Sequence, residues 1–132
     1  MVTMRGPVIW VVEDDPSAQR VIADSLKLNG FHPIVFGNAE KAYGALQTDT
    51  LPSLIILDML LPGMSGVDLI RLLKQNKQWE KIPVVVVSVL TRQDSPARES
   101  PEEANAVYWV NKPFEANDLI RTIQDILTAV RY

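Results

Sequence analysis

Residues 9–16 read IWVVEDDP: four apolar residues run directly into three carboxylates and then a proline. The apolar part is short, rich in β-branched residues and continuous rather than alternating, which is typical of a strand buried on both faces of a parallel sheet. The carboxylates of Glu13, Asp14 and Asp15 repel one another and resist removal from water. A strand that ends in this way needs positive charge close to its end.

The length and composition indicate one globular domain. The chain has 132 residues, the size of an ordinary domain, and its 47% of hydrophobic residues can fill a sizeable core. A net charge of −3 argues against direct binding of nucleic acid, and the lack of cysteine excludes disulfides and thiolate metal sites. No apolar run approaches the roughly 18–20 residues that span a bilayer, so we expect a cytoplasmic protein without a membrane partner.

Short apolar runs alternate with helical patterns along the rest of the chain. The runs predict strands at 8–12, 32–36, 53–58, 83–88 and 106–110. Apolar spacing and capping patterns predict helices at 17–30, 38–47, 65–76 and 115–130. This alternation predicts an α/β fold with a parallel sheet, right-handed crossovers and helices on both faces. In such a sheet, ligands bind beyond the carboxyl ends of the strands.

Local signals mark several helix ends. Asp15 is positioned to cap the first helix, Asn38 is a candidate N-cap of the second, and Gly30 supplies a stop between them. Ser65 and Asp68 have the spacing of a capping box at the start of the third helix.

The segment DSPARESPEEAN, residues 94–105, is where a further helix is expected before the fifth strand. It contains Pro96 and Pro101 and has no apolar stripe. A proline inside a helix costs about 3 kcal/mol. The segment therefore predicts a helix that is short or irregular.

Polar side chains follow the predicted strands where each one ends. The first strand ends in the three acids 13–15, the third in Asp58, the fourth in Ser88 and the fifth near Lys112. Because parallel strands end at one edge of the sheet, we expect these groups to converge. Mg²⁺ prefers carboxylate oxygens, and an ammonium and a hydroxyl beside it suit the oxygens of a phosphoryl group. Asp58 can then act as a nucleophile and form an aspartyl phosphate.

Each of these signals is common when taken singly, but the ordered set resembles a response-regulator receiver domain, the phospho-accepting domain of two-component signalling. The matching stretches are VVEDDP (11–16), LIILDMLLPGMSGVDLI (54–70), VVVVS (84–88) and VNKPF (110–114), and the resemblance covers about residues 7–130. It implies a five-stranded parallel sheet in the order 2-1-3-4-5, flanked by five helices. Residues 1–132 would form one such domain after a short extension at 1–6, and any output domain would lie outside this chain.

The resemblance also implies roles for individual residues at the acidic edge. Asp58 matches the phosphorylated aspartate. Asp14 matches the carboxylate that binds Mg²⁺ directly, and Glu13 would act largely through metal-bound water. The backbone carbonyl of Leu60 would be the third ligand.

Four further positions complete the implied site. Ser88 matches the switch hydroxyl and Lys112 the phosphoryl-binding lysine, whose bond to Pro113 is cis in the family. Trp109 occupies the switch-aromatic position, where Tyr or Phe is usual. The chain departs from the family at Val89, where Ala or Gly is usual.

The sequence therefore predicts a phosphorylation-switched signalling domain, with no enzymatic activity beyond its own phosphorylation and dephosphorylation. The donor would be a sensor histidine kinase or a histidine phosphotransfer protein, and the resemblance allows a homodimer after phosphorylation. Apolar Leu60 and Leu90 would flank the attacking water and slow the loss of the phosphoryl group.

Three alternatives fit the sequence less well than this prediction. A haloacid-dehalogenase-type phosphohydrolase also uses a nucleophilic aspartate, but it carries a second acid where this chain has Leu60. A nucleotide-binding module is disfavoured because no glycine-rich phosphate loop follows the first strand. A docking module that works without phosphorylation keeps the fold, but the intact Asp14, Asp58, Ser88 and Lys112 argue against it.

Overall fold

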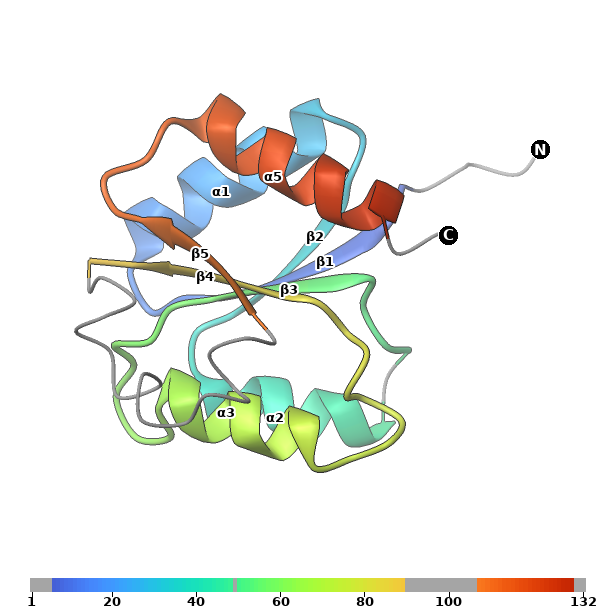
Figure 1. Cartoon of the computed structure of the whole chain (residues 1–132). Helices are drawn as coiled ribbons and strands as arrows, with labels where there is room; N and C mark the ends of the chain where they lie inside the picture. Colours follow the sequence, from blue (N-terminus) through green and yellow to red (C-terminus); the bar gives the residue numbers. More distant parts are fainter. Residues whose placement is uncertain (1–5, 49, 90–106, 130–132) are drawn as a thin grey trace.

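A computed structural model describes residues 6–48, 50–89 and 107–129 of the chain (Figure 1). With the labels of Figure 1, the elements in chain order are β1 (Val8–Val12), α1 (Pro16–Leu28), β2 (His32–Phe36), α2 (Ala39–Thr48), β3 (Leu54–Leu57), α3 (Gly66–Lys74), β4 (Val84–Ser88), β5 (Val107–Asn111) and α5 (Ala116–Ala129). Every predicted element within these ranges is present. The predicted short helix at 94–105 and Leu90 lie outside them.

The five strands form one parallel sheet in the order β2-β1-β3-β4-β5, which confirms the predicted topology. β1 lies between β2 and β3, and its Trp10 pairs with Ile34 on one side and Ile55 on the other. The strand ladder continues into the polar residues: Asp58 N donates to Val12 O at 3.1 Å and Glu13 N to Phe36 O at 3.1 Å. The backbone of the sheet therefore fixes where these side chains begin.

The sheet separates two apolar cores. Helices α1 and α5 cover one face and α2 and α3 cover the other (Figure 1). Successive residues of a strand point to opposite faces. Ile9 and Val11 accordingly pack in the core under α1 and α5, whereas Trp10 and Val12 pack in the core over α2 and α3. This double burial explains why the strands read as continuous apolar runs.

The helices begin and end at the predicted signals. Asp15 caps α1 by accepting a hydrogen bond from Ala18 N at 3.0 Å, and Pro16 occupies the first helical position. Gly30 follows α1 with a φ of +83°, a conformation that favours glycine. Ser65 and Asp68 form the predicted capping box at the start of α3.

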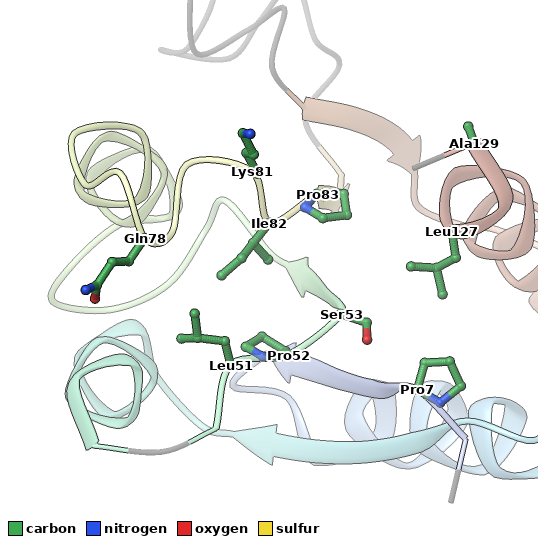
Figure 2. A pocket seen from close by; sticks show the side chains of 10 residues that line it. All are labelled: Pro7, Leu51, Pro52, Ser53, Gln78, Lys81, Ile82, Pro83, Leu127 and Ala129. Atoms are coloured by element: carbon green, nitrogen blue, oxygen red, sulfur yellow. The ribbon is translucent and has the colours of Figure 1, made fainter. Parts of the chain in front are cut away.

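A cavity of about 750 Å³ opens at the amino edge of the sheet, where β1, β3 and β4 begin and α5 ends (Figure 2). Pro7, Leu51, Ile82 and Leu127 are among the residues that line it, and none of its ten lining residues is acidic. The carboxylates of Glu13, Asp14 and Asp58 lie at the other edge, where β1 and β3 end. In the part of the chain that the structure describes, no helix is both long and apolar enough to cross a membrane.

Candidate functional site

Three carboxylates converge at the carboxyl edge of the sheet, as the strand order predicts. Ligand oxygens of Glu13, Asp14 and Asp58 all lie within 4.8 Å of one another. Glu13 and Asp58 are buried, with 3% and 8% of their surface exposed, whereas Asp14 is exposed. The cluster thus has an inner, desolvated part and an outer part that faces water.

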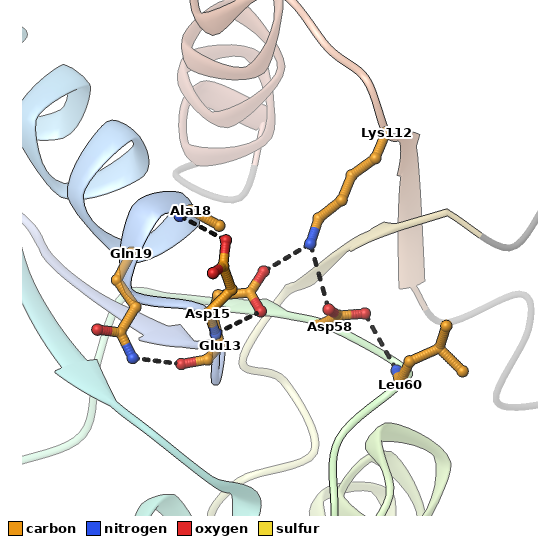
Figure 3. A network of polar contacts seen from close by, with 7 residues as sticks. All are labelled: Glu13, Asp15, Ala18, Gln19, Asp58, Leu60 and Lys112. Carbon is orange, nitrogen blue, oxygen red and sulfur yellow. Dashed lines mark hydrogen bonds and ion pairs between the residues drawn. The ribbon is translucent and has the colours of Figure 1, made fainter.

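Lys112 bridges the two buried carboxylates. Its Nζ donates to Glu13 Oε1 at 2.7 Å and to Asp58 Oδ2 at 3.2 Å (Figure 3). The lysine follows β5, and its backbone N–H donates to Ser88 O at 2.9 Å, which continues the β4–β5 ladder. The next peptide bond, to Pro113, is cis, the form that the resemblance implied.

The electrostatics of the cluster reflect both burial and this bridge. Burial raises the pKa of Glu13 above its usual range, and the charge of Asp58 adds to the effect while the Lys112 hydrogen bond opposes it. Burial alone would lower the pKa of Lys112, but its hydrogen bonds and charge interactions with Glu13 and Asp58 outweigh that effect, so the pKa is raised. Lys112 therefore stays protonated at neutral pH.

The donor set fits a divalent cation. With all groups ionised, three carboxylates and one ammonium leave an excess of two negative charges, which a dication balances. Hard carboxylate oxygens are the ligands that Mg²⁺ prefers, and a ligand on the exposed side leaves room for the waters that Mg²⁺ retains. Glu13, Asp14 and Asp58 could therefore hold Mg²⁺.

The loop after β3 holds the second oxygen of Asp58. Leu60 N donates to Asp58 Oδ1 at 3.0 Å, while the Leu60 side chain is 51% exposed and points away from the carboxylate (Figure 3). The start of α3 lies directly against this loop, because a Cβ on Gly66 would come within 2.7 Å of Asp58 O and 2.9 Å of Met59 Cα. Asp58 is therefore fixed by a backbone arrangement that leaves no space for a side chain at residue 66.

The remaining predicted residues lie on β4 and β5 or directly after β4. Ser88 is fully buried at the end of β4, and Trp109 is half-buried on β5, packed against the core over α2 and α3. Val89 is 62% exposed. Val89 and Lys112 also line a groove of about 440 Å³ beside α1, with Val21 and Phe114 among its apolar residues.

The sequence did not predict the contacts that hold Glu13 itself. Asp15 N donates to Glu13 Oε2 at 3.3 Å, and the Gln19 side chain donates to Glu13 O at 2.5 Å (Figure 3). Gln19 lies on the first turns of α1, so the helix also fixes the backbone at the end of β1. A glutamine at that position gives no signal in the sequence alone.

Comparisons with known proteins decide the family. The sequence model of the response regulator receiver domain matches residues 9–124, most of the chain. The chain belongs to the receiver domain family. The sequence-based recognition is therefore confirmed, and the chain is a signalling domain of the two-component response-regulator type.

Two similar curated proteins are named as a transcriptional regulator and a DNA-binding response regulator. It is 29% identical over 124 residues to the phosphate regulon transcriptional regulatory protein PhoB of Pseudomonas aeruginosa, an alignment that covers 94% of this chain and 53% of PhoB. It is 32% identical over 124 residues to the DNA-binding response regulator MtrA of Mycolicibacterium smegmatis, covering 94% of this chain and 51% of MtrA. The chain thus spans about half the length of the curated relatives it matches.

A solved structure supports the fold independently. The receiver domain of a signal transduction histidine kinase from Syntrophus aciditrophicus superposes with a TM-score of 0.83 at 28% identity, covering 95% of this chain and 92% of that one. Receiver domains similar to this one therefore occur in histidine kinases as well as in transcriptional regulators.

Proposed function

We propose that this receiver domain accepts a phosphoryl group on Asp58 from the phosphohistidine of a sensor histidine kinase or histidine phosphotransfer protein, with Mg²⁺ bound beside it. The observation that supports this most directly is the Asp58 carboxylate, which is buried at the end of β3 between Lys112 Nζ at 3.2 Å and Leu60 N at 3.0 Å. Incubation with acetyl phosphate and Mg²⁺, followed by mass spectrometry of the modified residue, tests it.

The transfer assigns a task to each side chain. An oxygen of Asp58 forms the bond to phosphorus while the bond from phosphorus to the donor imidazole nitrogen breaks, and the imidazole keeps that electron pair. Lys112 stands beside the acceptor and offsets the charge that gathers on the phosphoryl oxygens. Ser88 then turns toward the phosphoryl group, and Trp109 follows on the adjacent strand. The surface formed by β5 and its neighbours changes as a result.

Mg²⁺ would be held by Asp14 and Asp58 directly, by Glu13 through water and by the carbonyl oxygen of Leu60. When bound, it supplies positive charge that offsets the carboxylates and the phosphoryl oxygens. We further propose that residues 1–132 form one receiver domain, whose output lies in a partner or in a linked domain.

Mg²⁺ should raise the melting temperature of the wild-type protein, and Asp14→Ala should abolish that gain. A ligand that binds only the folded state at 100 times its Kd stabilises it by about 2.7 kcal/mol. Asp14 lies at the exposed side of the cluster, so its loss removes a ligand and also relieves repulsion. We therefore expect Asp14→Ala to melt slightly higher than wild type without Mg²⁺. Thermal melts over a Mg²⁺ series measure both effects.

Asp24→Ala is the matched control for this experiment, because Asp24 is an exposed aspartate on α1 outside the cluster. It should keep the full response to Mg²⁺. A Mg²⁺ gain of equal size in Asp14→Ala would show that Asp14 is not a ligand.

Leu60→Asn should shorten the lifetime of the phosphorylated protein. Hydrolysis needs a water in line behind the phosphorus, and the exposed, apolar Leu60 side chain cannot orient one. An amide there can, so we expect decay about threefold to tenfold faster, below the ~10²-fold typical of full general-base catalysis. The measurement is the decay of phosphorylated protein after removal of the donor.

Leu51→Asn is the control for the general effect of replacing a leucine by asparagine, since Leu51 lies at the opposite, amino edge of the sheet. Its decay rate should equal that of wild type. Decay that is unchanged or slower in Leu60→Asn would mean that this side chain does not limit access of water.

A further inference from the structure

A carboxylate on α2 reaches across to the loop that follows Asp58. Glu40, in the first turn of α2, accepts a hydrogen bond from Met64 N at 3.1 Å, although the two residues are 24 positions apart. The same carboxylate covers Gly63: a Cβ there would lie 2.4 Å from Glu40 Oε2. Gly63 has a φ of +73°, so the chain turns directly beneath the carboxylate.

The loop that Glu40 contacts consists of residues 59–65. Its first part is held by the bond from Leu60 N to Asp58 Oδ1, and its last part by the capping box of Ser65. Buried Met59 and Leu61 anchor it in the core over α2 and α3. Glu40 adds a contact from a separate element at the turn between these two anchored ends.

We propose that Glu40 is a positioning residue for the Asp58 site. By holding the turn at Gly63 and Met64, it keeps the Leu60 peptide in place, with the amide on Asp58 and the carbonyl directed as a metal ligand requires. The part of this inference that concerns the metal rests on the proposed function. The hydrogen bond acts through the loop, so Glu40 touches neither the metal nor the phosphoryl group.

Because Glu40 lies on the surface, a positioning role and a merely structural role predict different effects of its substitution. Glu40 is exposed, and an exposed polar contact contributes little to global stability. Outer contacts that orient the ligands of a metal nevertheless change its affinity by roughly 10- to 100-fold. Loss of the bond should therefore weaken Mg²⁺ binding much more than it lowers the melting temperature.

Two conservative substitutions distinguish the hydrogen bond from the charge of Glu40. Glu40→Gln removes the charge but keeps an acceptor oxygen at the same reach, whereas Glu40→Asp keeps the charge and withdraws the acceptor by one methylene. We expect Mg²⁺ affinity within about twofold of wild type in Glu40→Gln and about tenfold weaker in Glu40→Asp, at the lower limit for outer contacts. Lys41→Ala, on the next position of the same helix turn, should match wild type.

The measurements are a Mg²⁺ titration, a thermal melt and the amide NMR shifts of Leu60 and Met64 without metal. The Met64 shift should move in Glu40→Asp and stay in place in Glu40→Gln. A larger loss of affinity in Glu40→Gln than in Glu40→Asp would attribute the effect to long-range charge, and unchanged affinity in Glu40→Asp would show that the hydrogen bond has no effect; either result overturns the proposal. Failure of wild type to bind Mg²⁺ would refute the proposed function instead, and the amide shifts would still test the hold of Glu40 on the loop.

Discussion

We expect acetyl phosphate with Mg²⁺ to phosphorylate the wild-type protein at Asp58 and to leave Asp58→Asn unmodified. This is the largest effect that we predict. The amide has nearly the volume of the carboxylate and can still accept the hydrogen bond from Leu60 N. Its nitrogen and oxygen are poor nucleophiles, however, and it carries no charge. Intact-mass spectrometry after incubation, with beryllofluoride-induced NMR shifts as a second measurement, detects the loss.

Asp125→Asn is the matched control for this result, because Asp125 is an exposed aspartate on α5 at a distance from the cluster. It should be phosphorylated at the wild-type rate. Incorporation in Asp58→Asn equal to that in wild type would mean that another residue accepts the phosphoryl group.

The second large effect concerns stability. Lys112→Met should lower the free energy of unfolding at neutral pH by about 2–4 kcal/mol without metal, because it removes the positive charge that both buried carboxylates share. We place the loss slightly below the usual cost of breaking a buried pair because the Lys112 side chain is 20% exposed. Urea denaturation without Mg²⁺ measures it, and Mg²⁺ should restore part of the loss by replacing the missing positive charge.

The pH dependence of this loss follows from Glu13. Its pKa is raised by burial, and it rises further without Lys112. A raised folded-state pKa gives stability that is present below the usual value of 4.5 and is lost as the pH rises through the folded-state pKa. The difference between wild type and Lys112→Met should therefore be largest near neutral pH and shrink as the pH falls toward 4.5, because Glu13 takes up its proton above that value in the folded state.

Lys74→Met separates this effect from the loss of any partly buried lysine. Lys74 Nζ donates to the backbone oxygen of Glu80 at 2.8 Å, and burial lowers its pKa although the charge of Glu80 opposes this. It lies outside the acidic cluster, so its replacement should cause no Mg²⁺-dependent recovery. A loss in Lys112→Met that does not change with pH or Mg²⁺ would contradict the bridging role.

The sequence predicted the fold closely because local and global signals agree in this chain. The apolar run 8–12 is strand β1 to the residue, and Asp15, Gly30 and Ser65 mark helix ends where the capping patterns indicated. The order of strands came from the family resemblance. Hydrophobic periodicity alone predicts a parallel sheet but does not tell which strands are neighbours.

The polar contacts of the site were less accessible to sequence reasoning. The sequence predicted that Asp58 and Lys112 lie at one edge of the sheet. It could not show that Lys112 also forms an ion pair with Glu13, 99 positions away. The Glu40–Met64 bond likewise joins residues of no shared pattern. Such contacts depend on rotamers and on how elements pack, and neither leaves a periodic trace in the chain. The sequence also could not predict that Glu13 is buried while Asp14 is exposed, because the two are adjacent acidic residues.

The division of the interior by the sheet has a consequence for how this domain can vary in evolution. Neighbours along a strand, such as Ile9 and Trp10, share no core, whereas Trp10 and Leu73 of α3 do. Residues without shared partners change free energy nearly independently, whereas residues in contact are coupled. Replacements at alternate positions of one strand are therefore compensated by different helices. The core under α1 and α5 can diverge in sequence while the core that anchors the loop 59–65 stays constant. Two selective pressures can therefore act on a single five-residue strand.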